Sequence, residues 1–196
     1  MQDIISTPLI FPKVEPSDWN KWWSIWNKNS RFLRKIVQNH NEAGARWVGM
    51  DIYIAPGIDS TRVTGYEAPY VDCSDLFRQV LDNIDQLPIN VQAIRAVSSV
   101  CAVVPHSDFS VPEFSVRSML YDTNSTSTFY YDVDVNRVYQ QLPNESNTWG
   151  YWDNKCKHGT DYHSGHRKIL LMYYGKTKSD INIENSIAYY TDYVIR

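Results

Sequence analysis

Two polar residues that could bind a metal follow an apolar stretch in the middle of the chain. His106 and Asp108 come directly after residues 97–104, which form a mostly apolar run typical of a strand. Residues two apart on an extended backbone point to the same face, so an imidazole and a carboxylate would lie side by side. Together they could bind a first-row transition metal if a third ligand arrives from elsewhere in the chain.

The third ligand has a candidate in His158, which lies close to another predicted strand and nine residues before Arg167. Two histidines and one carboxylate that leave coordination positions open are the ligands of non-haem Fe(II) oxygenases. The alternative for His106 and Asp108 is a polar turn at the end of a strand. The sequence therefore predicts a metal centre at His106, Asp108 and His158, which would also be the catalytic residues.

Two arginines stand where the interior of a strand is expected. Arg167 opens an aliphatic stretch, residues 167–174, and Arg117 lies inside an alternating stretch, residues 114–121. Burying a guanidinium is costly unless it is paired, and a bound dicarboxylate could supply the pair through two parallel hydrogen bonds. The alternative for Arg167 is a surface position on an edge strand. For Arg117, a side chain that faces solvent is about as well supported as one that binds a carboxylate.

The elements that must position these residues are two helices followed by a series of strands. Ser17 or Asp18 can cap a first helix, and four tryptophans begin an apolar stripe at helical spacing that continues to about residue 39, which favours core packing. A second helix is expected from residue 74 or 75 to about residue 88. The predicted strands lie at residues 46–55, 114–121, 128–131, 137–139, 167–174 and 187–195, and residues 89–104 are also strand-rich.

This order of elements predicts a mainly β protein with N-terminal helices, built as an antiparallel sandwich or barrel with the helices on one face. Residues 1–16 would form an extended arm, and residues 57–72 a polar connection or a lid. At 196 residues the chain is expected to form a single domain. The aromatic content (7 Trp, 14 Tyr and 6 Phe) suits a β-rich fold with a ring-lined interior.

Composition narrows the function classes. The formal net charge is −3 and Lys and Arg form no run, so no nucleic-acid partner is expected. The three cysteines show no framework spacing, which predicts reduced thiols in a cytoplasmic protein. No signal peptide is visible and no apolar run approaches the ~20 residues of a membrane span, so no membrane association is expected.

The combined pattern resembles the Fe(II)- and 2-oxoglutarate-dependent oxygenase superfamily. Prolyl hydroxylases have a similar pattern. In this chain it consists of His106-x-Asp108, then His158, and nine residues later Arg167 on an aliphatic strand. The pattern around this set also resembles aspartyl/asparaginyl β-hydroxylases, through Pro105, through Arg117 about ten residues after the first ligand, and through the Trp-Asp pair at 152–153. Asp108 departs from that second family, which often lacks the carboxylate ligand. The resemblance covers roughly residues 95–175.

The resemblance implies a double-stranded β-helix (jelly-roll, cupin-like) core at residues 89–196, supported by the arm and helices of residues 1–88. His106, Asp108 and His158 would hold Fe(II). Arg167 would bind the distal carboxylate of the cosubstrate 2-oxoglutarate, with Arg117 or Tyr121 helping to position it.

The implied activity is that of a dioxygenase, an oxidoreductase that converts 2-oxoglutarate to succinate and hydroxylates a C–H bond of a prime substrate. A peptide or an amino-acid side chain is the favoured substrate. Two alternatives keep the same barrel: a catalytically inactive cupin-like binding or structural protein, and a redox-inert metal isomerase that would not need Arg167. The oligomeric state is left open by the sequence.

Two other histidines compete with His158 for the third ligand position. His166 adjoins Arg167, and neighbours on a strand face opposite sides, so the two side chains cannot both point into the barrel. His163 leaves too little chain to place a ligand at the metal and the Arg167 guanidinium at the far end of a five-carbon diacid. His158 leaves room for a strand end and a turn, and it is therefore the predicted ligand.

Overall fold

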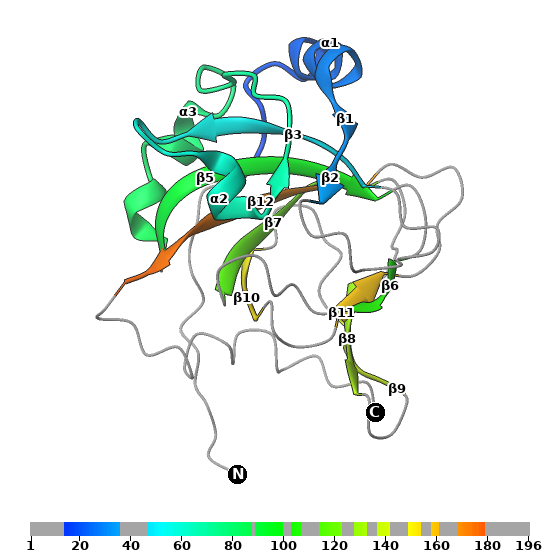
Figure 1. Ribbon diagram of the computed structural model, residues 1–196. Coiled ribbons are helices and arrows are strands. Elements are labelled where there is room, and N and C mark those ends of the chain that lie inside the picture. The colour runs from blue at the N-terminus through cyan, green and yellow to red at the C-terminus, as the bar shows by residue number, and fades with distance from the viewer. Residues whose placement is uncertain are drawn as a thin grey trace.

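The computed structural model describes residues 14–35, 47–87, 89–99, 103–106, 114–122, 128–132, 137–141, 149–153, 158–160 and 168–178. These residues form a mainly β structure with short helices (Figure 1). The largest sheet has six strands in the order β1-β3-β5-β12-β7-β10, and a smaller sheet has the order β6-β11-β8-β9. Every strand pair in these two sheets is antiparallel.

The strands of the large sheet come from both halves of the chain. They are β1 (Arg31–Phe32), β3 (Trp47–Ile54), β5 (Ile89–Ser99), β7 (Phe114–Asp122), β10 (Trp149–Asp153) and β12 (Lys168–Thr177). The small sheet comprises β6 (Val103–His106), β8 (Thr128–Asp132), β9 (Arg137–Gln141) and β11 (His158–Thr160). A two-stranded ribbon joins β2 (Arg34–Lys35) to β4 (Tyr66–Glu67). The predicted strands within residues 46–174 are thus confirmed wherever the structure describes them.

The first helix, α1 (Trp19–Asn29), begins as predicted and ends earlier than predicted. The Asp18 carboxylate accepts a hydrogen bond from the backbone N–H of Lys21 at 3.0 Å and caps the helix. The prediction of a helix to residue 39 is wrong, because Ser30 adopts an extended conformation and its hydroxyl donates to the Trp26 carbonyl at 2.7 Å. A polar side chain that bonds the last turn in this way competes with continuation of the helix, and β1 and β2 follow instead.

The second predicted helix is broken into shorter pieces. Residues 74–77 form turns, α3 spans Arg78–Leu81, and a 3₁₀ turn, η1, spans Ile84–Gln86. The apolar stripe nevertheless does what its spacing indicated, since Leu76, Phe77 and Val80 are buried in the core. The expected loop at residues 57–72 also contains structure, namely the five-residue helix α2 (Ser60–Thr64) and strand β4.

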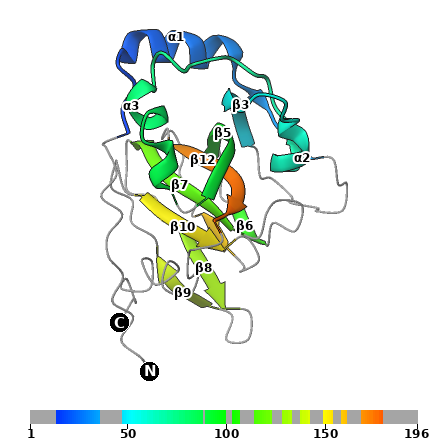
Figure 2. The ribbon, with the colours of Figure 1, turned by 90° about the vertical axis from the view of Figure 1, so that its left-hand side faces the viewer.

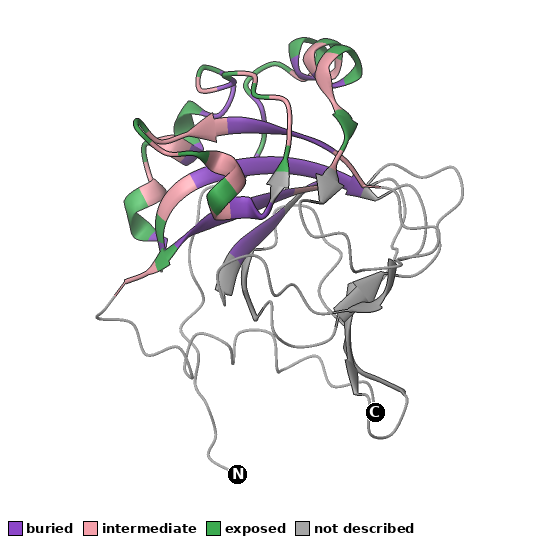
Figure 3. Ribbon diagram, viewed as in Figure 1, coloured by how far each residue is buried: buried purple, intermediate pink, exposed green. Residues whose placement is uncertain are grey.

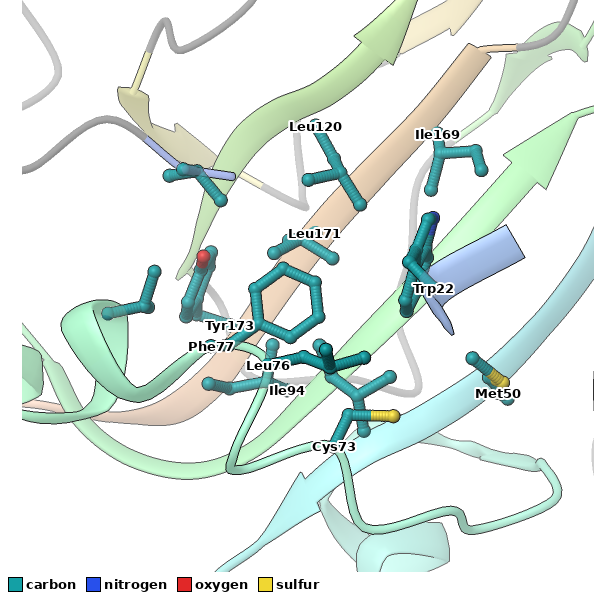
Figure 4. Packing of buried hydrophobic residues seen from close by; sticks show 14 of the residues in the cluster. Trp22, Met50, Cys73, Leu76, Phe77, Ile94, Leu120, Ile169, Leu171 and Tyr173 are labelled. Atoms are coloured by element: carbon teal, nitrogen blue, oxygen red, sulfur yellow. The ribbon is translucent and has the colours of Figure 1, made fainter. Parts of the chain in front are cut away.

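The large sheet is covered differently on its two faces. Helices α1 and α3 lie on one face, and the small sheet lies on the side away from them (Figures 1 and 2). The main apolar core fills the helix-covered face, where strand residues such as Ile169 and Leu171 meet Trp22 of α1 (Figure 4). A smaller cluster of Val97, Met172 and Tyr174 lies on the opposite face. Figure 3 shows that β5 and β12, at the centre of the large sheet, are buried along most of their described length.

The tryptophan stripe of α1 is confirmed as a packing face. Trp22 and Trp26 are buried, and Trp22 meets Phe77 edge-on with ring centroids 5.3 Å apart. Within the part of the chain that the structure describes, no helix is long and apolar enough to cross a membrane. Most of the predicted N-terminal arm and the predicted strand at 187–195 lie outside the described residues.

Candidate metal and anion site

Two of the three predicted metal ligands occupy directly paired positions in the small sheet. His106 is the last residue of β6, His158 is the first residue of β11, and the two are register partners in this antiparallel pair. Directly opposite positions of antiparallel strands hold their Cβ atoms about 4.5–5.5 Å apart. The backbone therefore brings the two histidine positions together at one end of the β6–β11 pair, although the strands are far apart in the sequence.

The other predicted residues of this centre lie outside the described residues. Asp108 follows β6 by two residues, and Arg167 directly precedes the first residue of β12. For His106 and His158 the structure describes the backbone and not the side chains. Among the side chains that it does describe, no group of three or more His, Cys, Asp or Glu could hold a metal ion. The ligand set thus stays a prediction beyond the pairing of the two histidine positions.

A row of four residues in register crosses the large sheet on the face away from α1. Asp51 of β3 pairs with Arg95 of β5, Arg95 pairs with Met172 of β12, and Met172 pairs with Arg117 of β7. Register partners on neighbouring strands share a face of the sheet, and Met172 belongs to the apolar cluster opposite the main core. Arg95 and Arg117 therefore share one face of the large sheet, and the small sheet lies on that side.

One of these arginines is neutralised within the row. The Nε of Arg95 donates to Oδ1 of Asp51 at 2.6 Å, and its Nη2 donates to Oδ2 at 3.1 Å. The two side chains are 1% and 0% exposed. Paired bonds of this kind hold both charges in a fixed geometry. The pair joins β3 to β5 and places a fixed dipole in the interior of the sheet.

Of the two arginines predicted to bind the cosubstrate, Arg117 is the one whose side chain the structure describes. It is 7% exposed and flanked by Met172 on β12 and by Gly150 on β10. The alternative of a solvent-facing side chain for Arg117 is therefore wrong. A guanidinium buried on this face retains its charge at all physiological pH values and interacts strongly with an anion because the surroundings are poorly solvated.

Tyr121, the other predicted helper, lies on the opposite face of the sheet. Its ring packs against Trp23 and Trp19 of α1, with centroids 4.8 and 5.8 Å away. Residues 117 and 121 would share a face in a regular strand, but the register between β7 and β12 shifts here. Ile169 pairs with Tyr121 and Leu170 with Met119, so one residue of β7 is extra, and such a bulge reverses the alternation.

Sequence reasoning missed Asp51 and Arg95. Both lie in predicted strands, at residues 46–55 and 89–104, where each is a charged residue among apolar ones. Two opposite charges in strands that are expected to be buried indicate an ion pair, because an isolated buried charge would be very costly.

The thiol of Cys73 is not activated. Burial and the nearby Asp72 charge raise its pKa to about 11.

The comparisons with known proteins found a distant structural likeness and no match by sequence. No protein-family model matches the sequence, and no curated protein matches it. Among solved structures, the chain is similar to an oxidoreductase of the 2OG-Fe(II) oxygenase family from Burkholderia pseudomallei. The identity is 11%, the TM-score is 0.45, and the similarity covers 81% of each chain. Between proteins this distant, neither an activity nor a substrate transfers from one to the other.

Proposed function

We propose that this protein is an Fe(II)- and 2-oxoglutarate-dependent dioxygenase that hydroxylates a peptide or an amino-acid side chain. The observation that carries the proposal is the pairing of His106 with His158 at one end of β6 and β11. Two imidazoles at adjacent positions and a carboxylate two residues beyond the first suit Fe(II) and leave coordination positions open. His106, Asp108 and His158 would hold the metal.

The order of the strands supports a double-stranded β-helix core within residues 89–196. From β5 onward the chain moves between the two sheets, and consecutive strands β5, β6, β7 and β8 alternate from one to the other. The resulting orders, β5-β12-β7-β10 and β6-β11-β8-β9, are built from two antiparallel four-strand sets, as in a jelly roll. Residues 1–88 add β1 and β3 to the edge of one sheet and the helices to its outer face.

Fe(II) held by His106, Asp108 and His158 would supply the redox chemistry by which O2 oxidises the cosubstrate and the substrate C–H bond. The chain's own residues bind and orient. Arg117 and Arg167 would pair with carboxylate groups of 2-oxoglutarate, and the burial of Arg117 strengthens such a bond by excluding water. Asp51 holds Arg95 fixed in the same row, so that its positive charge is already balanced. Tyr121 belongs to the packing of α1 and takes no part in this scheme.

A direct experiment combines metal binding with cosubstrate turnover. Purified protein is loaded anaerobically with Fe(II), and 2-oxoglutarate is then titrated with and without metal. The proposal expects one iron per chain, cosubstrate binding that depends on iron, and slow succinate release in the presence of O2. Protein that stays metal-free at saturating Fe(II) would overturn it. Stoichiometric iron without succinate release, with candidate peptides present, would instead favour the inactive cupin-like alternative.

A further inference from the structure

A surface pocket lies at the edge of the large sheet, apart from the row that contains Arg117. It is lined by Phe32 of β1, by Thr61 of α2 and by Glu67, Ala68 and Pro69 in and after β4, and its volume is about 420 Å³. This is within the range of pockets that hold small ligands. Nothing in the proposed oxygenase reaction uses it.

The walls of the pocket are anchored on the same strand. Phe32 pairs with Val48 of β3. Farther along the same strand, Asp51 donates its backbone N–H to the Pro69 carbonyl at 2.8 Å. Both walls therefore take their positions from β3, whose central residues are buried. A pocket whose sides are fixed in this way is formed before any ligand arrives, so binding would not require ordering of its walls.

The lining combines an open aromatic ring with a carboxylate that has no partner among the side chains that the structure describes. The Phe32 residue is 63% exposed, which leaves its ring accessible. The Glu67 side chain is exposed, and its carboxylate makes no hydrogen bond or ion pair with any side chain that the structure describes. A cation over an aromatic face is attracted to it, and arginine does this more often than lysine. A guanidinium also matches a carboxylate with two parallel hydrogen bonds.

We propose that this pocket binds an arginine side chain presented by a peptide or protein partner. The guanidinium stacks on the Phe32 ring and pairs with the Glu67 carboxylate, while the aliphatic part of the side chain lies on Ala68 and Pro69. The proposal does not depend on the oxygenase assignment. It requires only that the ring and the carboxylate reach the common space that Phe32 and Glu67 both line.

Several of the chain's own arginines adjoin the pocket residues and could compete for the site. Arg62, next to Thr61, pairs with Asp59 at 3.4 Å. Arg31, next to Phe32, donates to the carbonyls of Lys28 and Ser30 at 2.7 and 2.9 Å. Arg34 occupies the register position opposite Glu67 in the β2–β4 ribbon. It is the residue to remove in order to test internal competition.

The test uses the full chain and three labelled heptapeptides of the sequence Gly-Gly-Ser-X-Ser-Gly-Gly. Position X is arginine, lysine or citrulline, the neutral isostere of arginine. Binding is followed by amide chemical shifts in NMR spectra of the isotope-labelled protein. The arginine peptide is expected to shift the amides of Phe32, Thr61 and Glu67, the lysine peptide to bind more weakly, and the citrulline peptide not to bind. Equal shifts from the citrulline peptide would overturn the proposal.

Variants complete the test, and those at Phe32, Glu67 and Asp82 change exposed residues and leave the core unchanged. Glu67→Gln is expected to weaken the arginine peptide about three- to tenfold, and Phe32→Ala about two- to fivefold, with recovery in Phe32→Trp. Asp82→Asn removes a surface carboxylate that does not line the pocket and should change nothing. Arg34→Gln should leave the affinity equal or raise it. An unchanged affinity in Glu67→Gln, or a loss in Arg34→Gln, would contradict the proposed site.

Discussion

His106 and His158 face each other as register partners where β6 ends and β11 begins. An antiparallel pair places such partners at the shortest distance that two strands allow. The pairing shows that two candidate ligand positions from distant segments of the chain lie at the same end of one strand pair. Among the histidines after residue 157, His158 is the one whose position the structure describes, and it lies beside His106.

The first prediction follows from this pairing. His158→Ala should lose stoichiometric Fe(II), because one of the two paired imidazole positions is then empty. His163→Ala and His166→Ala are matched controls from the same segment and should retain the metal. Iron content after anaerobic loading and desalting measures the difference. A His158→Ala protein that still binds one iron per chain would refute the assignment.

The second prediction concerns the buried guanidinium of Arg117. Arg117→Ala should weaken 2-oxoglutarate binding at least tenfold while iron affinity stays nearly unchanged, since a charge-assisted hydrogen bond contributes about 1.5–3 kcal/mol. Arg117→Lys should recover only part of the loss because an ammonium cannot form the paired contact. Anaerobic titration of the iron-loaded variants gives the two affinities separately.

Tyr121→Phe supplies the control for that experiment. The Tyr121 ring packs against α1 on the other face of β7, so removal of its hydroxyl should leave cosubstrate affinity within about twofold of the parent. A loss in Tyr121→Phe as large as in Arg117→Ala would show that the phenol reaches the cosubstrate after all.

Much of the fold could be predicted from apolar spacing, and the failures have local causes. Aliphatic stretches predicted the strands before His106 and after Arg167, and the structure has strands at both places. The end of α1 was missed because Ser30 and Asn29 bond back to the carbonyls of Trp26 and Ile25, at 2.7 and 2.9 Å. Such side-chain competition with the helix leaves no trace in apolar periodicity.

The cosubstrate role predicted for Tyr121 fails for a different reason. Alternation along a strand predicts faces only while the register is unbroken, and the bulge near Leu120 inserts one residue into β7. The pairing partner of a strand, not its own sequence, determines where such a bulge falls. The Asp51–Arg95 pair was missed for the same reason, since their two strands had to be placed side by side before the charges could be matched.

The third prediction tests that buried pair. Asp51→Ala should lower the free energy of unfolding by about 3–5 kcal/mol, because it leaves the Arg95 charge buried without its carboxylate. Asp75→Ala removes the carboxylate of an exposed pair with Arg78, at 2.8 Å, and should cost less than about 1 kcal/mol. Urea denaturation of the three proteins measures both changes. Similar losses in the two variants would contradict the importance assigned to burial.

The fourth prediction concerns the thiol of Cys73. Burial first, and then the negative charge of Asp72, raise its pKa from the ordinary value of 9.0 to about 11. At pH 8 the thiolate fraction is then about a hundredfold smaller than for an unperturbed thiol, so native protein should react slowly with iodoacetamide.

The same shift has a consequence for stability. The unfolded chain releases the Cys73 proton near pH 9 and the folded chain near pH 11, so stability should fall as the pH rises between these values and be unaffected below them. Both measurements require a Cys101→Ser, Cys156→Ser background, in which Cys73→Ser serves as the control. Rapid native alkylation of Cys73 at pH 8 would contradict the burial of its sulfur.

The last prediction compares two glycines. A Cβ added at Gly175 would overlap the Asn90 carbonyl oxygen and lie 2.7 Å from its carbonyl carbon, because β12 and β5 come unusually close at a register shift. Since backbone must move to relieve this contact, Gly175→Ala should lower the free energy of unfolding by about 2–3 kcal/mol. Gly57 has a positive φ of 76° but open space around it, so Gly57→Ala should cost only about 1 kcal/mol from backbone conformation. Urea denaturation decides between the two costs, and a Gly57→Ala loss equal to or greater than that of Gly175→Ala would contradict the close approach of β12 to β5.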